Sequence, residues 1–293
     1  VSGLIPFAVE CGSPVIGPTV ADLERGRALA ISQGLRPRHL LLTNPHNPLG
    51  IIYRPDIVFN AITWSRKHKM HTIVDEIYAL STHKNYGHGF ESVIRIMNNQ
   101  LNDDVHFVWA MSKDFGASGL RIGVMYSQNE VVLHAAGNLN IFSNVSHPMQ
   151  SIVADLLTDD AFVDSFLDEM RERLHRNFII CITKLEEMVI PYIPAEAGLF
   201  VYTDFSSLLP ERSMNGEAML ASFITKHARV VLTPGSSQRD SKPGMFRICY
   251  AWVHPDILMI SMERLSRLVA KIRKFDWEDL NQMESMSGIL KDI

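Results

Sequence analysis

The first half of the chain alternates short apolar runs with segments of helical periodicity, and this alternation limits the possible folds more than any other feature. Strands are predicted at His39–Thr43, His71–Val74, Val105–Ala110 and Arg121–Tyr126, and a helix at Asp56–Lys69. A strand, a helix and a second strand within about 35 residues form a βαβ unit. We therefore expect an α/β domain with a mostly parallel sheet, in which His39–Thr43 is a buried strand.

The second half has a different pattern, typical of an α+β domain. Helices are predicted at Gln128–Asn138, His147–Leu157, Asp159–Val189, Asn215–Lys226 and Pro255–Phe275. Strands are predicted at Leu199–Asp204, Arg229–Leu232 and Phe246–Tyr250. We place the boundary near residue 155, within helical sequence. The expected organisation is a large domain over 1–155, a small domain over 156–276 and a loosely held tail over 277–293.

Composition excludes several classes of function. The 293 residues carry 28 basic and 32 acidic side chains, a net charge of −4, which is no electrostatic footprint for nucleic acid or an anionic membrane. No apolar run reaches the roughly 18 residues of a membrane span, and the segment after Val1 has no signal-peptide pattern. Three scattered cysteines argue against disulfides, and the histidines lack metal-ligand spacing. We expect a protein of the cytoplasm without a metal.

Two polar clusters follow the first two predicted strands. In open α/β sheets, ligands bind outside the carboxyl ends of the strands. The first cluster is the stiff loop Thr43–Gly50, whose two Asn-Pro pairs could aim Asn47 at a ligand oxygen, or could simply form a well-capped turn. The second contains Asp75 and Tyr78. A carboxylate there could bind a cationic ring nitrogen or a metal, or could act as a helix N-cap.

Two further clusters contain basic side chains. Lys113 directly follows an apolar strand, where a lysine can be activated for Schiff-base formation. Arg121, beyond a glycine-rich stretch, could clamp a phosphate. The alternative is a glycine-rich turn flanked by solvated charges. Arg247 lies inside an apolar strand and needs a partner, either a ligand carboxylate or a structural acid.

The clusters, in this order, resemble the pyridoxal 5'-phosphate (PLP) enzymes of fold type I in the class I/II aminotransferase superfamily. The closest resemblance is to the 1-aminocyclopropane-1-carboxylate synthases and their relatives. It extends from about residue 5 to residue 273 and rests on six segments: TNPHNPLG, VDEIYA, SKDFGASGLRIGVMYS, AGLFVYTDF, TPGSS and FRICYA. It implies a large domain with a mostly parallel sheet and a small α+β domain.

The resemblance also implies roles for residues that bind the cofactor. Lys113 would form the Schiff base and then transfer the proton at the substrate α-carbon. Asp75 would pair with the pyridine nitrogen and keep it protonated. Tyr78 and Asn47 would hydrogen-bond the phenolic oxygen of the ring, and Arg121 would bind the cofactor phosphate. The spacings of three residues from Asp75 to Tyr78 and eight from Lys113 to Arg121 match the family's motifs.

The remaining implied roles include one departure from the family. Arg247 would bind the α-carboxylate of an amino-acid substrate, with Gly198 and Phe200 packed nearby; otherwise Phe200 is a core strand residue. The family usually has a phosphate-binding serine three positions before the lysine, where this chain has Ala110. Ser112 beside the lysine remains available, and the lost hydrogen bond is worth about 1.5–3 kcal/mol.

The resemblance leaves the family's N-terminal segment without a counterpart. That segment contains the N-terminal arm, a glycine-rich phosphate turn and the aromatic ring that stacks on the cofactor. We expect a PLP-dependent aminotransferase or lyase that acts on an amino acid, with transamination or carbon–sulfur elimination ahead of cyclopropane formation. We also expect a homodimer, because family members generally complete their sites across the interface. The alternative is a non-catalytic fragment that serves as an interaction module.

Overall fold

The computed structural model describes residues 3–13, 15–83, 89–275, 277 and 279. The chain forms two compact units. Unit 1 comprises residues 1–47, 51–171 and 196–198, and unit 2 comprises 48–50, 172–195 and 199–293. The units divide after Arg171, inside the long helix α7 (Asp160–Glu187), whereas the sequence pattern placed the boundary near residue 155.

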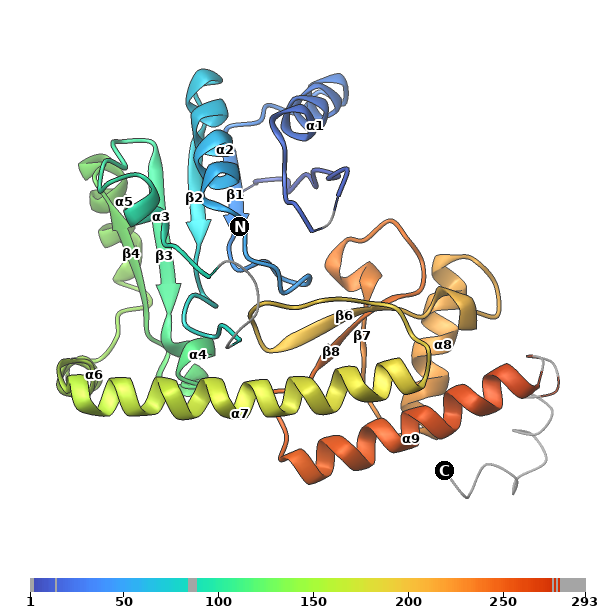
Figure 1. The fold of residues 1–293 in the computed structure, drawn as a ribbon. Helices are drawn as coiled ribbons and strands as arrows, with labels where there is room; N and C mark the ends of the chain where they lie inside the picture. The colour runs from blue at the N-terminus through green and yellow to red at the C-terminus, as the bar shows by residue number, and fades with distance from the viewer. Residues whose placement is uncertain (1–2, 14, 84–88, 276, 278, 280–293) are drawn as a thin grey trace. The chain divides into compact units, whose positions relative to one another are not determined.

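Unit 1 contains a four-stranded sheet in the order β1-β2-β3-β4 (Figure 1). Its strands are β1 (His39–Thr43), β2 (His71–Asp75), β3 (Val105–Ala110) and β4 (Gly123–Ser127). The first three are parallel, and β4 is antiparallel to β3, so the predicted mostly parallel sheet is confirmed.

The helices of unit 1 connect these strands. They are α1 (Val20–Ser32), α2 (Pro55–Lys67), α3 (Val93–Ile96), α4 (Met111–Asp114), α5 (Glu130–Asn140), α6 (His147–Thr158), the first part of α7 and the 3-10 helix η1 (Ser118–Leu120). One core joins α1 and α2 to β1 through Leu23, Leu40, Leu42 and Trp64. The expectation that β1 is a buried strand is wrong for one face, because Leu41 points the other way and is 64% exposed.

Unit 2 contains an antiparallel sheet in the order β5-β6-β8-β7. Its elements are β5 (Tyr192–Ile193), β6 (Phe200–Asp204), β7 (Thr233–Pro234), β8 (Met245–Cys249), α8 (Met214–His227), α9 (Pro255–Lys274), the end of α7, and the 3-10 helices η2 (Ser206–Leu208) and η3 (Gly235–Gln238). Buried side chains of α7, α8, α9 and the strands form its core, among them Phe178, Leu220, Phe246 and Leu265.

Most predicted elements are present with ends shifted by a few residues. The strand predicted at Arg229–Leu232 is wrong: Arg229 has a left-handed backbone (φ 54°) after α8, and the strand begins only at Thr233. Helix α1 was not predicted, although Thr19 and Asp22 form a capping box at its start.

Most of the predicted tail over 277–293 lies outside the described residues. None of the helices in the described ranges combines the length and apolar character that spanning a lipid bilayer requires.

Candidate functional site

The carboxyl ends of β1, β2 and β3 meet at one edge of the unit 1 sheet. The strands are parallel and adjacent, and their register places Thr43 beside Asp75 and Asp75 beside Val108. Strand β3 leads directly into α4, which contains Lys113. In Figure 1 the three arrowheads point the same way, and α4 follows the tip of β3. The sheet therefore brings the first three predicted clusters to one edge.

The loop after β1 is held by buried hydrogen bonds. Asn44 is buried; its backbone N–H donates to the Asp75 carbonyl (2.9 Å), and its Oδ1 accepts from the Tyr53 N–H (2.8 Å). Burial lowers the pKa of His46 to about 4, so this ring is neutral at physiological pH. Asn47 follows in the same loop and is half-buried. Both earlier interpretations, a well-held turn and an aimed amide, are compatible with this arrangement.

Asp75 ends β2 as a half-buried carboxylate. Its Oδ1 accepts from the Ile77 N–H (3.1 Å), so Asp75 caps a turn and not the helix that the alternative interpretation required. Burial raises the pKa of Asp75. No cationic side chain in the described ranges forms an ion pair with Asp75. Burial disfavours the charged form of this carboxylate, and no cation among those residues offsets the effect. A protonated ring nitrogen would supply the missing positive charge. Tyr78, in the same turn, is buried.

The lysine and the arginine of the third cluster differ in their surroundings. Ser112 and Lys113 are half-buried in α4, and the Lys113 amine forms no hydrogen bond or ion pair within the described part of the chain. Arg121 is exposed and left-handed (φ 55°) after η1, and its guanidinium donates to the Ser118 carbonyl (3.0 Å). Both cations can therefore receive an anionic or carbonyl group.

Asp114 is a structural residue of the site that the sequence analysis missed. It is fully buried and accepts from the Ser81 hydroxyl (2.7 Å), the Trp109 indole N–H (2.8 Å) and the Leu80 N–H (3.1 Å). The interpretation of this stretch as solvated charges is therefore wrong for Asp114. These bonds tie α4, and with it Lys113, to the turn after β2. The only signal in the sequence was an acid next to the lysine, just after an apolar strand.

Glu76 is a second buried acid at this edge. Its Oε1 accepts from the Val93 N–H (2.6 Å) at the first turn of α3. Burial is the main cause that raises its pKa, to about 7. Glu76 therefore orients the chain behind Asp75 and titrates close to neutral pH.

A distant segment completes unit 1. Residues 196–198 pair with the turn after β2 through a Thr82–Ala197 bridge, a bond from the His83 N–H to the Glu196 carbonyl (2.8 Å) and one from the Gly198 N–H to that turn. Gly198 has a φ of 90°, which favours glycine. The contact is long-range, so no local pattern predicted the pairing of residues 196–198 with this turn.

Arg247 belongs to unit 2. It lies on β8 beside Tyr202 of β6, and its guanidinium carbon is 4.9 Å from the centre of the Phe200 ring. Phe200 is buried, so its interpretation as a core strand residue is confirmed. The stacked ring holds the guanidinium in place.

The comparisons with known proteins agree with this fold and these motifs. The family model described as "Aminotransferase class I and II" matches residues 7–265. The chain belongs to this family. The family consists of PLP enzymes of fold type I, so the fold, the resemblance and the cofactor class predicted above are confirmed.

The relatives include 1-aminocyclopropane-1-carboxylate synthase 2 of Arabidopsis thaliana, which is 36% identical over 259 residues, 86% of this chain and 52% of that protein. The corresponding synthase 4 of Solanum lycopersicum is 34% identical over 250 residues, 84% of this chain and 52% of that protein. The chain thus spans about half the length of the curated relatives it matches.

Among solved structures, an aromatic aminotransferase from Pyrococcus horikoshii OT3 matches with a TM-score of 0.75 and 19% identity, over 88% of this chain and 65% of that chain. A PLP-bound putative aminotransferase from Clostridium difficile 630 matches with a TM-score of 0.72 and 19% identity, over 86% and 61%. At this identity the likeness supports the fold alone.

Proposed function

We propose that the chain contains the cofactor-binding core of a PLP-dependent enzyme that acts on an amino acid, with Lys113 as the attachment residue. One observation carries this proposal: the Lys113 amine and the Asp75 carboxylate follow neighbouring parallel strands at one sheet edge, and neither has an ionic partner among the described residues. When bound, PLP supplies an electron sink for negative charge that develops at the substrate α-carbon.

The other residues of this edge position the cofactor. Asp75 keeps the ring nitrogen protonated, because a half-buried carboxylate without a cation gains most from such a partner. Tyr78 and Asn47 donate hydrogen bonds to the phenolic oxygen. Ser112 and Arg121 bind the phosphate. The Ser112 hydroxyl replaces part of the hydrogen bonding that Ala110 cannot supply.

Lys113 and Arg247 act on the substrate. Lys113 moves the proton at the α-carbon, and Arg247 binds the α-carboxylate through two parallel hydrogen bonds. We place transamination or carbon–sulfur elimination ahead of cyclopropane formation. Incubation with S-adenosylmethionine and analysis of the products tests this order. A cyclopropane amino acid as the main product would reverse it.

The attachment residue is tested by covalent labelling. The purified protein is incubated with PLP, reduced with borohydride and digested, and the labelled peptides are identified by mass spectrometry. We expect one dominant label, on the Lys113 peptide, that Lys113→Ala abolishes and Lys67→Ala leaves unchanged. Equal labelling of the two variants would contradict the enzyme proposal and favour the non-catalytic alternative.

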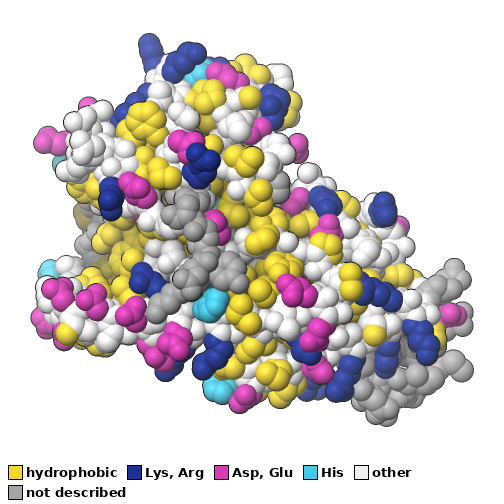
Figure 2. Space-filling view, viewed as in Figure 1, with side chains coloured by type: hydrophobic (Ala, Val, Ile, Leu, Met, Phe, Trp, Pro, Cys, Tyr) yellow, Lys and Arg dark blue, Asp and Glu magenta, His cyan; other side chains and the backbone are white. Residues whose placement is uncertain are grey.

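We also propose that the enzyme is a homodimer. Apolar side chains of α5 and the turn after it are exposed: Val131 (78%), Leu139 (71%), Ile141 (68%) and Phe142 (90%). Figure 2 shows hydrophobic side chains at the surface among charged ones on the visible face. A cluster of this kind is typical of an association surface. Light scattering should give a dimer that Phe142→Ser weakens; a monomeric wild-type protein would contradict this proposal.

A further inference from the structure

A cavity lies at the opposite edge of the unit 1 sheet from the PLP site. Its volume is about 420 Å³, within the usual range for sites that bind small metabolites. It opens at the amino ends of β1 and β2, and these strands separate it from the Lys113 edge by roughly 17 Å. The lining residues are Arg36, Pro37, Arg38, His39, Lys69 and His71.

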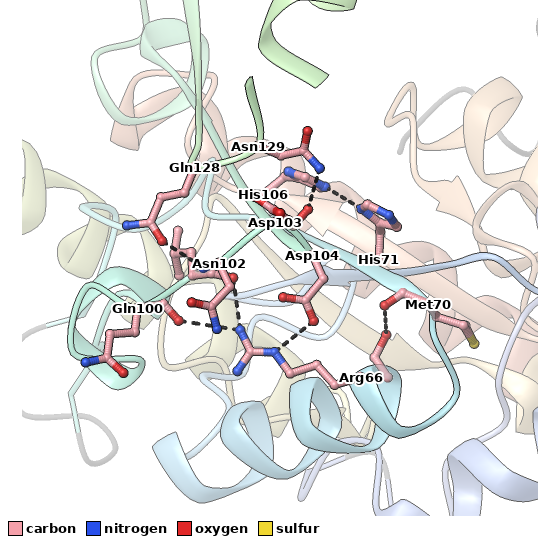
Figure 3. A network of polar contacts seen from close by, with 12 residues as sticks. Arg66, Met70, His71, Gln100, Asn102, Asp103, Asp104, His106, Gln128 and Asn129 are labelled. Carbon is pink, nitrogen blue, oxygen red and sulfur yellow. Dashed lines mark hydrogen bonds and ion pairs between the residues drawn. The ribbon is translucent and has the colours of Figure 1, made fainter. Parts of the chain in front are cut away.

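The lining is basic and contains no carboxylate. Arg36, Arg38 and Lys69 form no ion pair with any side chain in the described ranges. Asp104, an acid near the histidines, is already held by the Arg66 guanidinium at 2.8 Å, as Figure 3 shows. Like charges gathered without counter-charges repel one another, so a bound anion would stabilise this cluster.

Hydrogen bonds hold the backbone on both sides of the cavity before any ligand binds, while the side chains of Arg36, Arg38 and Lys69 are exposed. The His71 N–H donates to the Arg38 carbonyl (3.0 Å), which ties the two sides of the cavity together. Lys69 has a left-handed backbone (φ 54°) in a tight turn, and the Ser65 hydroxyl donates to the Met70 carbonyl (3.1 Å) across that turn. The backbone therefore needs no rearrangement when a ligand binds, and the entropy that is lost is that of the three exposed side chains.

A chain of imidazoles leads inward from the cavity. His71 Nδ1 lies 2.9 Å from His106 Nε2, and the rings are stacked with centroids 5.2 Å apart (Figure 3). His106 Nδ1 lies 2.8 Å from the Ser127 hydroxyl. Because His106 occupies Nδ1 of His71, the other ring nitrogen of His71 remains for a ligand. A protonated His71 can donate to His106 and to an anion at the same time.

We propose that this cavity binds a small phosphorylated anion. Two guanidiniums suit the paired oxygens of a phosphate, Lys69 adds a third positive charge, and the ring of His71 adds a hydrogen-bonding group. The cavity is concave and small, and the chain is acidic overall, which favours a metabolite over a nucleic-acid strand. The site is independent of the proposed PLP chemistry.

The experiment uses isothermal titration with inorganic pyrophosphate and, separately, with a phosphomonoester, at fixed ionic strength, on protein that carries one equivalent of PLP and has been freed of excess PLP by gel filtration. We expect saturable binding of at least one of them, weakened about tenfold or more by Lys69→Gln and by Arg38→Gln. Lys67→Gln removes an equal charge two residues away and should have little effect. Arg121→Gln, at the proposed cofactor phosphate, should also leave this binding unchanged.

A pH series adds a second readout. The groups that face His71 are His39 and Arg38 of the β1 side, Lys69 of the preceding turn, and His106 of the β3 side, and the charge of Asp104 acts on His106. Burial, together with the neighbouring cations, lowers the pKa of His39, and burial with the charge of His71 lowers that of His106. A bound anion offsets the neighbouring positive charge and so favours protonation of these imidazoles. Sulfate keeps the same charge between pH 5.5 and pH 8, and it should therefore bind more tightly at pH 5.5.

Three outcomes would overturn the proposal. The first is no saturable binding of either phosphate compound. The second is equal weakening by Lys67→Gln and Lys69→Gln, which would indicate attraction by net charge alone. The third is a single-stranded oligonucleotide that binds the wild type far more tightly than pyrophosphate does, because the cavity would then be part of a nucleic-acid surface.

Discussion

The titration of Glu76 tests whether burial controls the protonation of carboxyl groups at the carboxyl ends of β1, β2 and β3. Burial raises the pKa of this carboxyl to about 7 in the folded protein, from 4.5. Between these values the folded state binds more protons than the unfolded state. The stabilising effect of the protonated carboxyl is therefore fully present below about pH 4.5, falls as the pH rises and is lost above about pH 7. The difference between the two pKa values corresponds to about 3 kcal/mol.

The substitution Glu76→Gln should remove this pH dependence. The amide is neutral at every pH, and its oxygen can still accept from the Val93 N–H. Urea denaturation, followed by tryptophan fluorescence, is measured at pH 5 and pH 8.5 for both proteins. We expect the variant to gain about 2.5 kcal/mol relative to wild type between these two conditions. That gain corresponds to a shift of roughly 1 M in the urea midpoint.

The control is Glu91→Gln, which removes a more exposed carboxylate paired with Arg95 at 3.6 Å. Its effect should stay within about 0.5 kcal/mol at both pH values. If the difference between Glu76→Gln and wild type is the same at pH 5 and pH 8.5, Glu76 titrates normally. The conclusion that burial dominates the environment of the Glu76 carboxyl would then be wrong.

Three further predictions concern individual side chains. Asp114→Ala leaves one buried and two partly buried donors without their acceptor and should cost about 3 kcal/mol in urea denaturation, with a smaller loss for Asp114→Asn. Gly244→Ala should destabilise the protein by more than about 1 kcal/mol, because φ is +93° and the new Cβ would lie 2.6 Å from Ser206 Cα, whereas Gly137→Ala, in the open on α5, should be neutral or stabilising. Lys113→Ala should change stability by less than about 0.5 kcal/mol, because the amine has no partner among the described residues; a larger loss in thermal denaturation would contradict that placement.

The sequence was informative wherever the determining interactions are local. The apolar runs of β1, β2 and β3 predicted strands at nearly their observed positions, because hydrophobic periodicity and flanking turn residues act over short distances. The same locality placed Lys113 after β3 and Asp75 at the end of β2. The apolar pattern failed at Arg229. This residue has a left-handed backbone, and the strand begins only at Thr233.

The long-range features needed the tertiary structure. No pattern in the sequence indicated that Asp114 would accept bonds from Ser81 and Trp109, or that the segment around Ala197 would pair with Thr82. These contacts join residues that only the folded sheet brings together. The pKa of a carboxyl such as that of Asp114 depends on how deeply the fold buries it.

The sequence by itself predicted most of the strands and helices and the family, because hydrophobic periodicity and motif spacing are local properties of the chain. Only the tertiary structure decided which charges are compensated. It paired Arg66 with Asp104, left Asp75 and Lys113 without ionic partners among the described residues, and gathered the basic side chains around His71 into a cavity. The physical reason is that charge compensation depends on distance and burial in space, and neither is encoded by separation along the chain.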